Sequence, residues 1–349
     1  MKTFLKIFVI LVVFFKTETL LSKNNLFNVN NIEIEKNEKT SNNSLANQAI
    51  KKGFDELINK ILLKGDINKL SDLSFSSKKQ LVTYYQVSNS LDEKENIEIA
   101  KFNITFDKVK IHELFYKRNI QYSKISDKDL FVLPVLIKNN ELFVFNNNFF
   151  YQHWNEILEN DLIEFILPLE NIEIIQKINK FRHNLIDIEL DNLFKEYPSK
   201  NLALILIDNT ETKNKKVYFK TKIQGKNISK NLTFKKQDKS TDDLNREIIK
   251  ISKTEIINLV KSENLIDIRT PSFINAKLIF NKKTNIVKFN SRIKNIELVE
   301  NIYVQSFNKD FMNLRIKYLG KLDKVINQLK NENIRLEIVN DKWVLQILN

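Results

Sequence analysis

Hydrophobic and polar residues along the N-terminal half repeat at two different periods, which predicts a mixture of strands and helices. The clearest period of two covers residues 97–106 (IEIAKFNITF). Apolar residues three and four apart predict an amphipathic helix over 44–63, capped by Ser44 and ended near Gly65. The other expected elements are strands at 26–35, 130–137, 142–145 and 162–167, helical segments at 77–85 and 151–158, and a helix capped by Asp107 with Val109, Ile111, Leu114 and Phe115 inward.

The pattern after residue 170 predicts a smaller α/β region. A helix near 188–197 is expected to stop at Pro198, and 202–207 (LALILI) is typical of a core strand. The alternating segments 217–223 and 228–234 predict a hairpin whose turn contains Gly225. Thr241 or Asp242 is expected to begin a long amphipathic helix that ends near Asn264.

The last 75 or so residues show the most regular pattern, and their element order predicts a ferredoxin-like unit, βαββαβ, with one further strand. Two helices are expected to cover one face of its sheet, and the unit is expected to fold alone. Trp343 is expected to be largely buried, so that its truncation to Ala costs roughly 3–5 kcal/mol. The elements are strands at 276–280, 302–307 and 312–318, helices at 286–296 and 322–329, and a final hairpin of 334–339 with 343–348.

These patterns together predict an α+β, multi-domain protein. The expected organisation is a signal peptide over 1–22, a mixed α/β N-terminal domain over 23–170, a small α/β middle domain over 171–265 and the ferredoxin-like unit over 273–349. The chain is long for a single core.

The first 22 residues have the pattern of a secretory signal peptide. Lys2 and Lys6 precede an apolar run over 7–15 (IFVILVVFF), and Ser22 is a small residue suited to the cleavage position. The apolar run is shorter than the roughly 20 residues that span a bilayer, although a retained inner-membrane anchor is the alternative. We therefore expect a periplasmic, exported protein.

The order of segments resembles an uncharacterised family of exported proteobacterial proteins, classed only as a domain of unknown function. The matching features are the signal peptide, the helix residues 46–50 and 57–62, the strand and helix over 102–115 with Phe106-Asp107 at their junction, the strand 130–137, Leu167-Pro168-Leu169, and the unit over 274–347. The resemblance implies compartment and architecture, and it brings no catalytic residues.

The charge and the scarcity of Arg limit the kinds of partner that the sequence favours. The net charge of +13 is compatible with nucleic acid or an anionic membrane surface, but only seven of the 56 basic residues are Arg. Arg is the residue preferred for bidentate phosphate and base contacts, so a solvated Lys-rich surface is the favoured interpretation. If the charge has a partner, an anionic lipid or polysaccharide surface fits an exported protein better than DNA. The chain has no Cys, which removes disulfides and thiolate chemistry.

Histidines and carboxylates offer few candidates for chemistry. His112, His153 and His183 lie in separate segments without metal-ligand spacing, and His153-Trp154 is interpreted as part of a helix that packs its aromatic side. The alternative is a binding surface. The paired carboxylates are interpreted as solvated faces and helix caps rather than an acid and base in a pocket: Asp127 with Asp129, Glu156 with Glu159, Asp187 with Glu189 and Asp191, and Asp242 with Asp243.

The sequence therefore predicts no catalytic, metal or cofactor site. The expected function is that of an exported, non-enzymatic interaction or assembly module, with envelope proteins or an anionic envelope surface as partners. Two alternatives from other classes remain open. One is a hydrolase of envelope polymers that uses a carboxylate pair, and the other is a basic nucleic-acid-binding protein.

Overall fold

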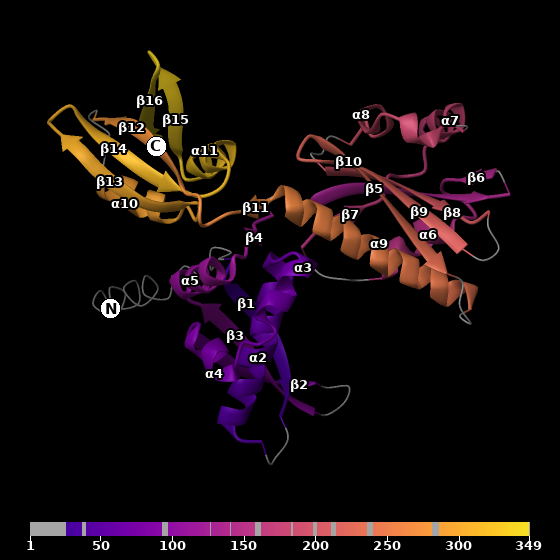
Figure 1. The fold of residues 1–349 in the computed structure, drawn as a ribbon, viewed down its shortest axis with the longest axis horizontal. Coiled ribbons are helices and arrows are strands. Elements are labelled where there is room, and N and C mark those ends of the chain that lie inside the picture. The colour runs from indigo at the N-terminus through magenta and orange to yellow at the C-terminus, as the bar shows by residue number, and fades with distance from the viewer. Residues whose placement is uncertain are drawn as a thin grey trace, which may run out of the picture. The chain divides into compact units, whose positions relative to one another are not determined.

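The architecture is α+β and multi-domain, as predicted (Figure 1). The chain divides into two compact units, the described residues up to Lys60 with Asp66–Ile120, and Ile61–Gly65 with the residues from Gln121 onward. The predicted signal peptide lies outside the described residues. A computed structural model describes residues 26–36, 40–92, 97–125, 127–139, 141–157, 162–182, 184–197, 201–210, 214–235, 240–280 and 286–348.

The first unit is a three-stranded antiparallel sheet with helix α2 (Asn42–Ile61) packed on it. The strand order is β1 (Asn28–Glu35), β3 (Ile97–Phe106) and β2 (Val82–Asp92). Gly53 marks the closest approach of helix to sheet, because a Cβ there would lie 2.6 Å from Ile32 Cδ1 and 3.1 Å from Ile104 Cδ1. The helix therefore sits directly over β1 and β3. The shorter helices are α3 (Lys64–Ile67), α4 (Phe75–Gln80) and α5 (Lys108–Arg118).

Two predictions for the helices of this unit were wrong in part. Helix α2 begins two residues before Ser44, and Ser41 Oγ accepts the Ser44 N–H at 3.3 Å, so the capping side chain is Ser41. The segment predicted as helix over 77–85 is helical only to Gln80, and Val82 already belongs to β2. The residues of β2 are largely uncharged and half of them polar, a pattern that fits a short amphipathic helix as well as a strand.

The cap of α5 was predicted correctly. Asp107 accepts hydrogen bonds from the backbone N–H groups of Val109 (2.9 Å) and Lys110 (3.2 Å), which satisfies two donors at the helix start. Ile111 and Phe115 are fully buried. Val109 was expected to point inward, but 65% of it is exposed, because position 109 lies in the first turn and faces away from the sheet.

The second unit is built on a six-stranded sheet in the order β10 (Lys226–Lys235), β9 (Asn214–Ile223), β8 (Asn201–Asp208), β5 (Asp129–Lys138) and β6 (Glu141–Phe143), with β7 (Glu164–Ile166) also paired to β5. Strands β5 and β8 are parallel neighbours at its centre. The predicted boundary between residues 170 and 171 runs through this sheet, because β5–β7 precede it and β8–β10 follow it.

Both faces of the central strands are buried. Leu130, Val132 and Ala203 face one core together with α6 (Phe149–His153) and the long α9 (Thr241–Glu263). Figure 1 shows α9 lying along this sheet. Leu133 and Leu204 face the other core, which α7 (Ile172–Lys180) and α8 (Leu190–Leu193) cover. Burial on both sides explains why these strands are continuous apolar runs.

Local predictions in this unit were mostly accurate. The hairpin of β9 and β10 is confirmed, and its turn holds Gln224 and Gly225 at positive φ (51° and 83°). Helix α9 starts where predicted, but its cap is Ser240, whose side chain accepts from the Asp243 N–H. The helix predicted over 188–197 is only the four-residue α8. Helix α7 was not predicted.

The C-terminal part has its own five-stranded sheet in the order β13 (Val299–Phe307), β14 (Phe311–Tyr318), β12 (Ser272–Ile279), β16 (Lys342–Ile347) and β15 (Ile334–Val339). With α10 (Ile286–Lys294) and α11 (Leu322–Asn331) the element order is the predicted βαββαβ and one strand. In a ferredoxin-like sheet the fourth strand pairs with the first. Here β16 lies between β12 and β15 and runs parallel to β12.

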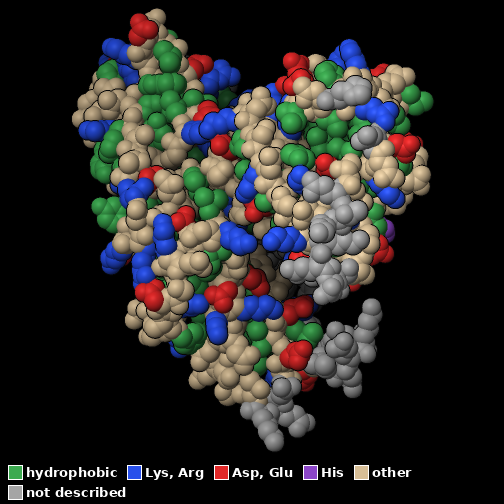
Figure 2. Space-filling model, turned by 45° about the vertical axis from the view of Figure 1, so that its right-hand side comes forward, with side chains coloured by type: hydrophobic (Ala, Val, Ile, Leu, Met, Phe, Trp, Pro, Cys, Tyr) green, Lys and Arg blue, Asp and Glu red, His purple; other side chains and the backbone are tan. Residues whose placement is uncertain are grey.

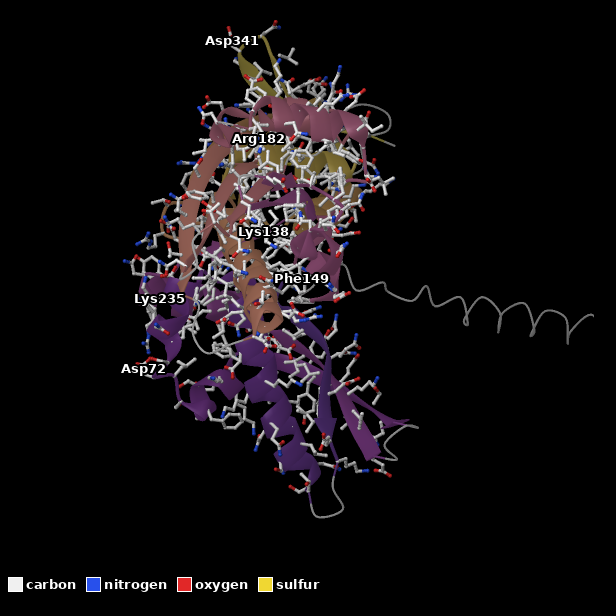
Figure 3. All side chains as sticks on the ribbon, turned by 90° about the vertical axis from the view of Figure 1, so that its right-hand side faces the viewer. Asp72, Lys138, Phe149, Arg182, Lys235 and Asp341 are labelled. Atoms are coloured by element: carbon white, nitrogen blue, oxygen red, sulfur yellow. The ribbon has the colours of Figure 1, made fainter. Side chains whose placement is uncertain are left out.

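One face of this sheet is the predicted two-layer core. Leu278 and Leu314 on the strands are buried together with Phe289 on α10 and Leu329 on α11. Trp343 is mostly but not fully covered, in line with the expectation that it is largely buried. It lies near the turn of the β15–β16 hairpin, whose tip carries Asp341 (Figure 3). The fully buried side chain of β16 is Leu345.

Candidate interaction surface

The histidines considered from the sequence lie in different surroundings. His153 stacks on Phe149, with ring centroids 4.2 Å apart, and its Nδ1 lies 2.8 Å from Glu156 Oε2. Hydrogen bonding to His153, with a further contribution from Arg246, lowers the pKa of the exposed Glu156. Trp154 next to it is fully buried in the core that α9 covers, which confirms that this segment packs its aromatic side.

His112 belongs to the other compact unit, where its ring meets Phe27 edge to face at 5.6 Å. His183 lies outside the described residues. Within the described part of the chain, no group of three or more His, Asp or Glu side chains could hold a metal ion. His112 and His153 therefore belong to different compact units of the chain.

The paired carboxylates take part in caps and ion pairs. Asp127 accepts from Gln224 Nε2 at 2.9 Å, and Asp191 pairs with Lys222 at 2.5 Å. Glu189 accepts from Asn192 Nδ2 at 2.7 Å, and Asp243 accepts from the Ser240 hydroxyl at 2.6 Å. Asp129 and Asp242 are exposed, and Glu159 lies outside the described residues. Asp187 accepts from Asn184. The exposed Asp191 ion pair and the Ser240–Asp243 contact at the start of α9 fit the solvated and capping roles expected from the sequence, whereas Asp127 is partly buried beside the β9–β10 turn.

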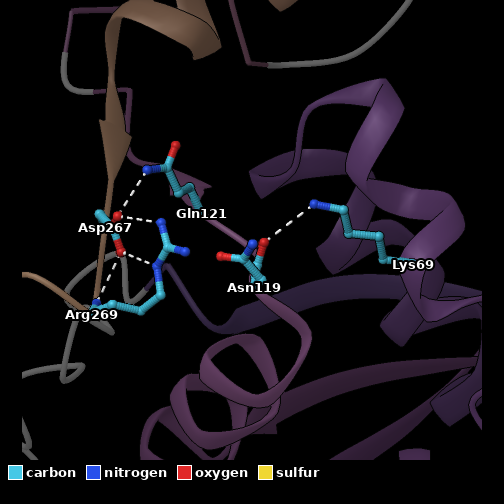
Figure 4. A network of polar contacts seen from close by, with 5 residues as sticks. All are labelled: Lys69, Asn119, Gln121, Asp267 and Arg269. Atoms are coloured by element: carbon cyan, nitrogen blue, oxygen red, sulfur yellow. Dashed lines mark hydrogen bonds and ion pairs between the residues drawn. The ribbon is translucent and has the colours of Figure 1, made fainter.

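A further polar network ties two short strands together (Figure 4). Asp267 accepts from Arg269 Nε (2.8 Å), Nη2 (2.5 Å) and backbone N–H (2.9 Å), and from Gln121 Nε2 (3.0 Å). The Arg269 side chain is the main reason why the pKa of Asp267 falls well below its usual range. Gln121 and Asp267 flank the pairing of β4 (Tyr122–Ser123) with β11 (Leu265–Ile266), so this network has a structural role. Figure 4 also shows the Lys69 ammonium donating to the Asn119 carbonyl in the first unit.

The most distinctive surface is the side of the C-terminal sheet opposite its helices, here called the outer face. It consists of the strand residues whose pairing places them on the side away from Leu278 and Leu314. Two aromatic side chains there are well exposed, Phe273 (45%) and Tyr303 (46%). The main members are Phe273, Asn275, Lys277, Ile279, Tyr303, Phe311, Asn313, Arg315, Lys317, Arg335, Glu337, Val339, Lys342 and Gln346, and the buried Val344 lies among them.

Cations dominate the charge of the outer face. Among the residues that regular strand pairing assigns to it, the cations are Lys277, Arg315, Lys317, Arg335 and Lys342, and the carboxylate is Glu337. Two of the cations lie over aromatic rings. The Arg315 guanidinium is 4.3 Å from the Phe273 ring centroid, and Lys277 Nζ is 3.8 Å from that of Phe311. Such cation–π contacts hold long side chains in place.

The outer face was not predicted, although the sequence carries a signal for it. The positions that alternate with the buried residues of β12 and β14 read Phe-Asn-Lys-Ile and Phe-Asn-Arg-Lys. Recognising one surface in these two sets requires knowing that β12 and β14 are paired. On the side of the molecule drawn in Figure 2, Lys and Arg side chains are dispersed among acidic and hydrophobic ones.

A scan of the chain against models of protein families finds no match, and a comparison with curated proteins finds none either. The resemblance to an exported family of unknown function stays a prediction. Among the described residues, no helix is both long and apolar enough to cross a membrane.

Proposed function

We propose that this is an exported protein of the cell envelope that acts through contacts rather than catalysis, and that the outer face of its C-terminal sheet binds an anionic lipid surface. The observation that carries the proposal is the charge of that face, five cations against one carboxylate in register positions. The signal-peptide pattern of residues 1–22 supports the compartment.

The physical chemistry of the face suits a phospholipid headgroup layer. Each Lys or Arg near an anionic membrane contributes about 1 kcal/mol, so five cations supply at most about 5 kcal/mol. That corresponds to weak, reversible and salt-sensitive binding. Exposed aromatic side chains such as Phe273 and Tyr303 suit the boundary between headgroups and acyl chains.

The test compares vesicles of a zwitterionic phospholipid with the same vesicles containing phosphatidylglycerol, using co-sedimentation of the full chain. The variant Lys277→Glu with Arg315→Glu should bind the anionic vesicles about tenfold more weakly or worse. The matched control is Lys51→Glu with Lys250→Glu, which changes the net charge equally at two exposed helix positions. The apolar run over 7–15 is common to all variants, so the comparison isolates charge on the outer face.

Two results would overturn the proposal. One is equal binding by the outer-face variant and the control variant. The other is a preference for single-stranded RNA over anionic vesicles at physiological salt, because aromatic side chains and cations on an open sheet face also suit bases and phosphates.

A further inference from the structure

The Arg315 guanidinium lies on the outer face of the C-terminal sheet without an oxygen acceptor among the described side chains. Its contact is the Phe273 ring, whose centroid is 4.3 Å from the guanidinium carbon. Other arginines of the described chain donate to oxygen acceptors: Arg118 to Asp72, Arg246 to Glu156, Arg269 to Asp267, and Arg292 to the carbonyl groups of Asn333 and Leu348. The exposed Arg315 therefore has hydrogen-bond donors open to a ligand.

The ring beside Arg315 leaves these donors usable. Guanidinium N–H groups point outward in the plane of the group, in a fork that matches two oxygens of one anion. A ring that lies against the face of the guanidinium does not occupy this fork, and the cation–π attraction restrains the long side chain. Less conformational entropy is then lost when an anion binds. Phe273 therefore prepares Arg315 for bidentate binding.

Strand pairing brings two further donors to the same end of the outer face. Lys317 lies two residues beyond Arg315 on β14 and pairs with Phe273, while Tyr303 on β13 pairs with Arg315. Cβ atoms of directly paired residues are about 5 Å apart, so these three long side chains can reach one ligand. The other residues paired with the two cations are uncharged, namely Asn275 and Asn301. The local set is a guanidinium fork, an ammonium and a phenol, with no carboxylate in register.

We propose that Arg315, Lys317 and Tyr303 form a binding site for a phosphate monoester carried by a membrane lipid headgroup. A phosphate monoester presents three terminal oxygens and close to two negative charges. The Arg315 fork takes two of the oxygens, and the Lys317 ammonium and the Tyr303 hydroxyl donate to the third. A phosphodiester or a carboxylate offers two such oxygens, which the fork alone occupies. The donor set therefore matches a monoester better than either alternative.

This inference rests on the membrane binding proposed above and assigns the headgroup that the outer face prefers. Its test is the ratio of two affinities of the full chain, measured by co-sedimentation with vesicles of phosphatidylcholine. One set of vesicles contains phosphatidic acid, a monoester, and the other contains phosphatidylglycerol, a diester. The content of each lipid is adjusted until both vesicles have the same electrophoretic mobility, so that mean surface charge is equal. The parent should bind the phosphatidic acid vesicles about tenfold more tightly.

Two variants probe the donors, each with a matched control. Arg315→Lys conserves the charge but removes the fork, so the ratio should fall to about one. Arg182→Lys makes the same exchange at an exposed position outside the outer face and should keep the parent's ratio. Lys317→Gln removes the third donor and should lower the ratio about threefold, whereas Lys250→Gln, at an exposed position of α9, should not. Circular dichroism checks that all four variants fold.

A competitor separates the lipid from a soluble phosphate monoester. Glycerol 3-phosphate, equal in concentration to the accessible phosphatidic acid, should displace little protein, because the other cations of the outer face hold the membrane as well. Complete displacement overturns the lipid as the source of the phosphate.

The outcomes separate this site from the proposed function. A parent ratio near one overturns the monoester site and leaves binding to anionic vesicles in place. A parent that binds neither kind of vesicle overturns the proposed function and this inference with it. A parent-like ratio in Arg315→Lys, or an equal fall in Arg182→Lys, overturns the role of the Arg315 fork.

Discussion

The buried side chain of Lys261 gives the protein a pH-dependent stability. It is 5% exposed on α9, and its ammonium donates to the Leu62 carbonyl at 3.0 Å. Burial lowers the pKa of Lys261 to about 8 from an ordinary 10.5. Because the ammonium must be desolvated in the folded state, the charged form is disfavoured there relative to the unfolded chain.

This shift predicts that stability rises with pH between about 8 and 10.5. Over that interval the unfolded chain holds the proton on Lys261 and the folded chain releases it, so the cost of burying the charge disappears as pH increases. The gain is at most about 3 kcal/mol. Urea unfolding of the parent and of Lys261→Met across this range measures it as the difference between two curves. The control Lys250→Met, at an exposed position of the same helix, should show the same pH dependence of the free energy of unfolding as the parent. If the difference in free energy of unfolding between the parent and Lys261→Met does not change with pH, the lowered pKa of Lys261 is contradicted.

Two neighbouring side chains on β16 allow burial to be tested by substitution. Trp343 is mostly covered but keeps some exposure near the hairpin turn, whereas Leu345 is fully buried against the paired strands. We expect Leu345→Ala to cost about 2–5 kcal/mol and Trp343→Ala only about 1–2 kcal/mol, although tryptophan is larger. Urea unfolding followed by far-UV circular dichroism compares the two. A Trp343→Ala variant less stable than Leu345→Ala would show that the hairpin end is packed.

At the scale of elements, the C-terminal unit remains the best candidate for independent folding. Its five strands form a sheet separate from the six-stranded one, and its helices bury Phe289 and Leu329 against it. The first strand begins at Ser272, which pairs with Tyr318, so the fragment should start at Pro271 rather than at Phe273. We expect residues 271–349 to unfold cooperatively on heating and to show dispersed amide signals. A broad, non-cooperative transition would mean that contacts such as Lys324 with Asn264 are required.

The elements that the sequence predicts well are those whose two faces differ. Strands β3 and β14 and helix α11 alternate or repeat cleanly because one side meets a core and the other meets solvent. Strand β2 was assigned partly to a helix, since its exposed residues show no apolar alternation. The partnership of β5 with β8 was missed, because strands buried on both faces carry no periodicity that identifies a neighbour. The outer face could not be predicted from a local motif either, because its residues come together only through the pairing of β12 with β14.

At the scale of the whole molecule, export is the prediction on which the proposed function depends. Replacing Val9 and Val12 by Asp puts charge into the apolar run and should leave the precursor in the cytoplasm, because charged side chains enter the membrane at high cost. Cell fractionation with an antibody to the protein measures this. Thr17→Asp with Thr19→Asp, just beyond the run, serves as a control for added charge. Efficient export of the Val9 and Val12 variant would refute the signal peptide.

The parallel pairing of β5 with β8 also governs the order in which this chain can acquire structure. Between Lys138 and Asn201 lie the 62 residues 139–200, and the central pair of the six-stranded sheet forms only after this loop closes. Closing such a loop costs conformational entropy before the contacts between β5 and β8 contribute any favourable free energy, and contacts so far apart in sequence slow folding. The first unit, complete at Ile120, needs none of these residues. When the chain emerges from its N-terminus, the first unit therefore folds first and the six-stranded sheet second. The apolar strand β5 stays unpaired with β8 until residues 139–200 have followed, so β8 is its last and slowest partner.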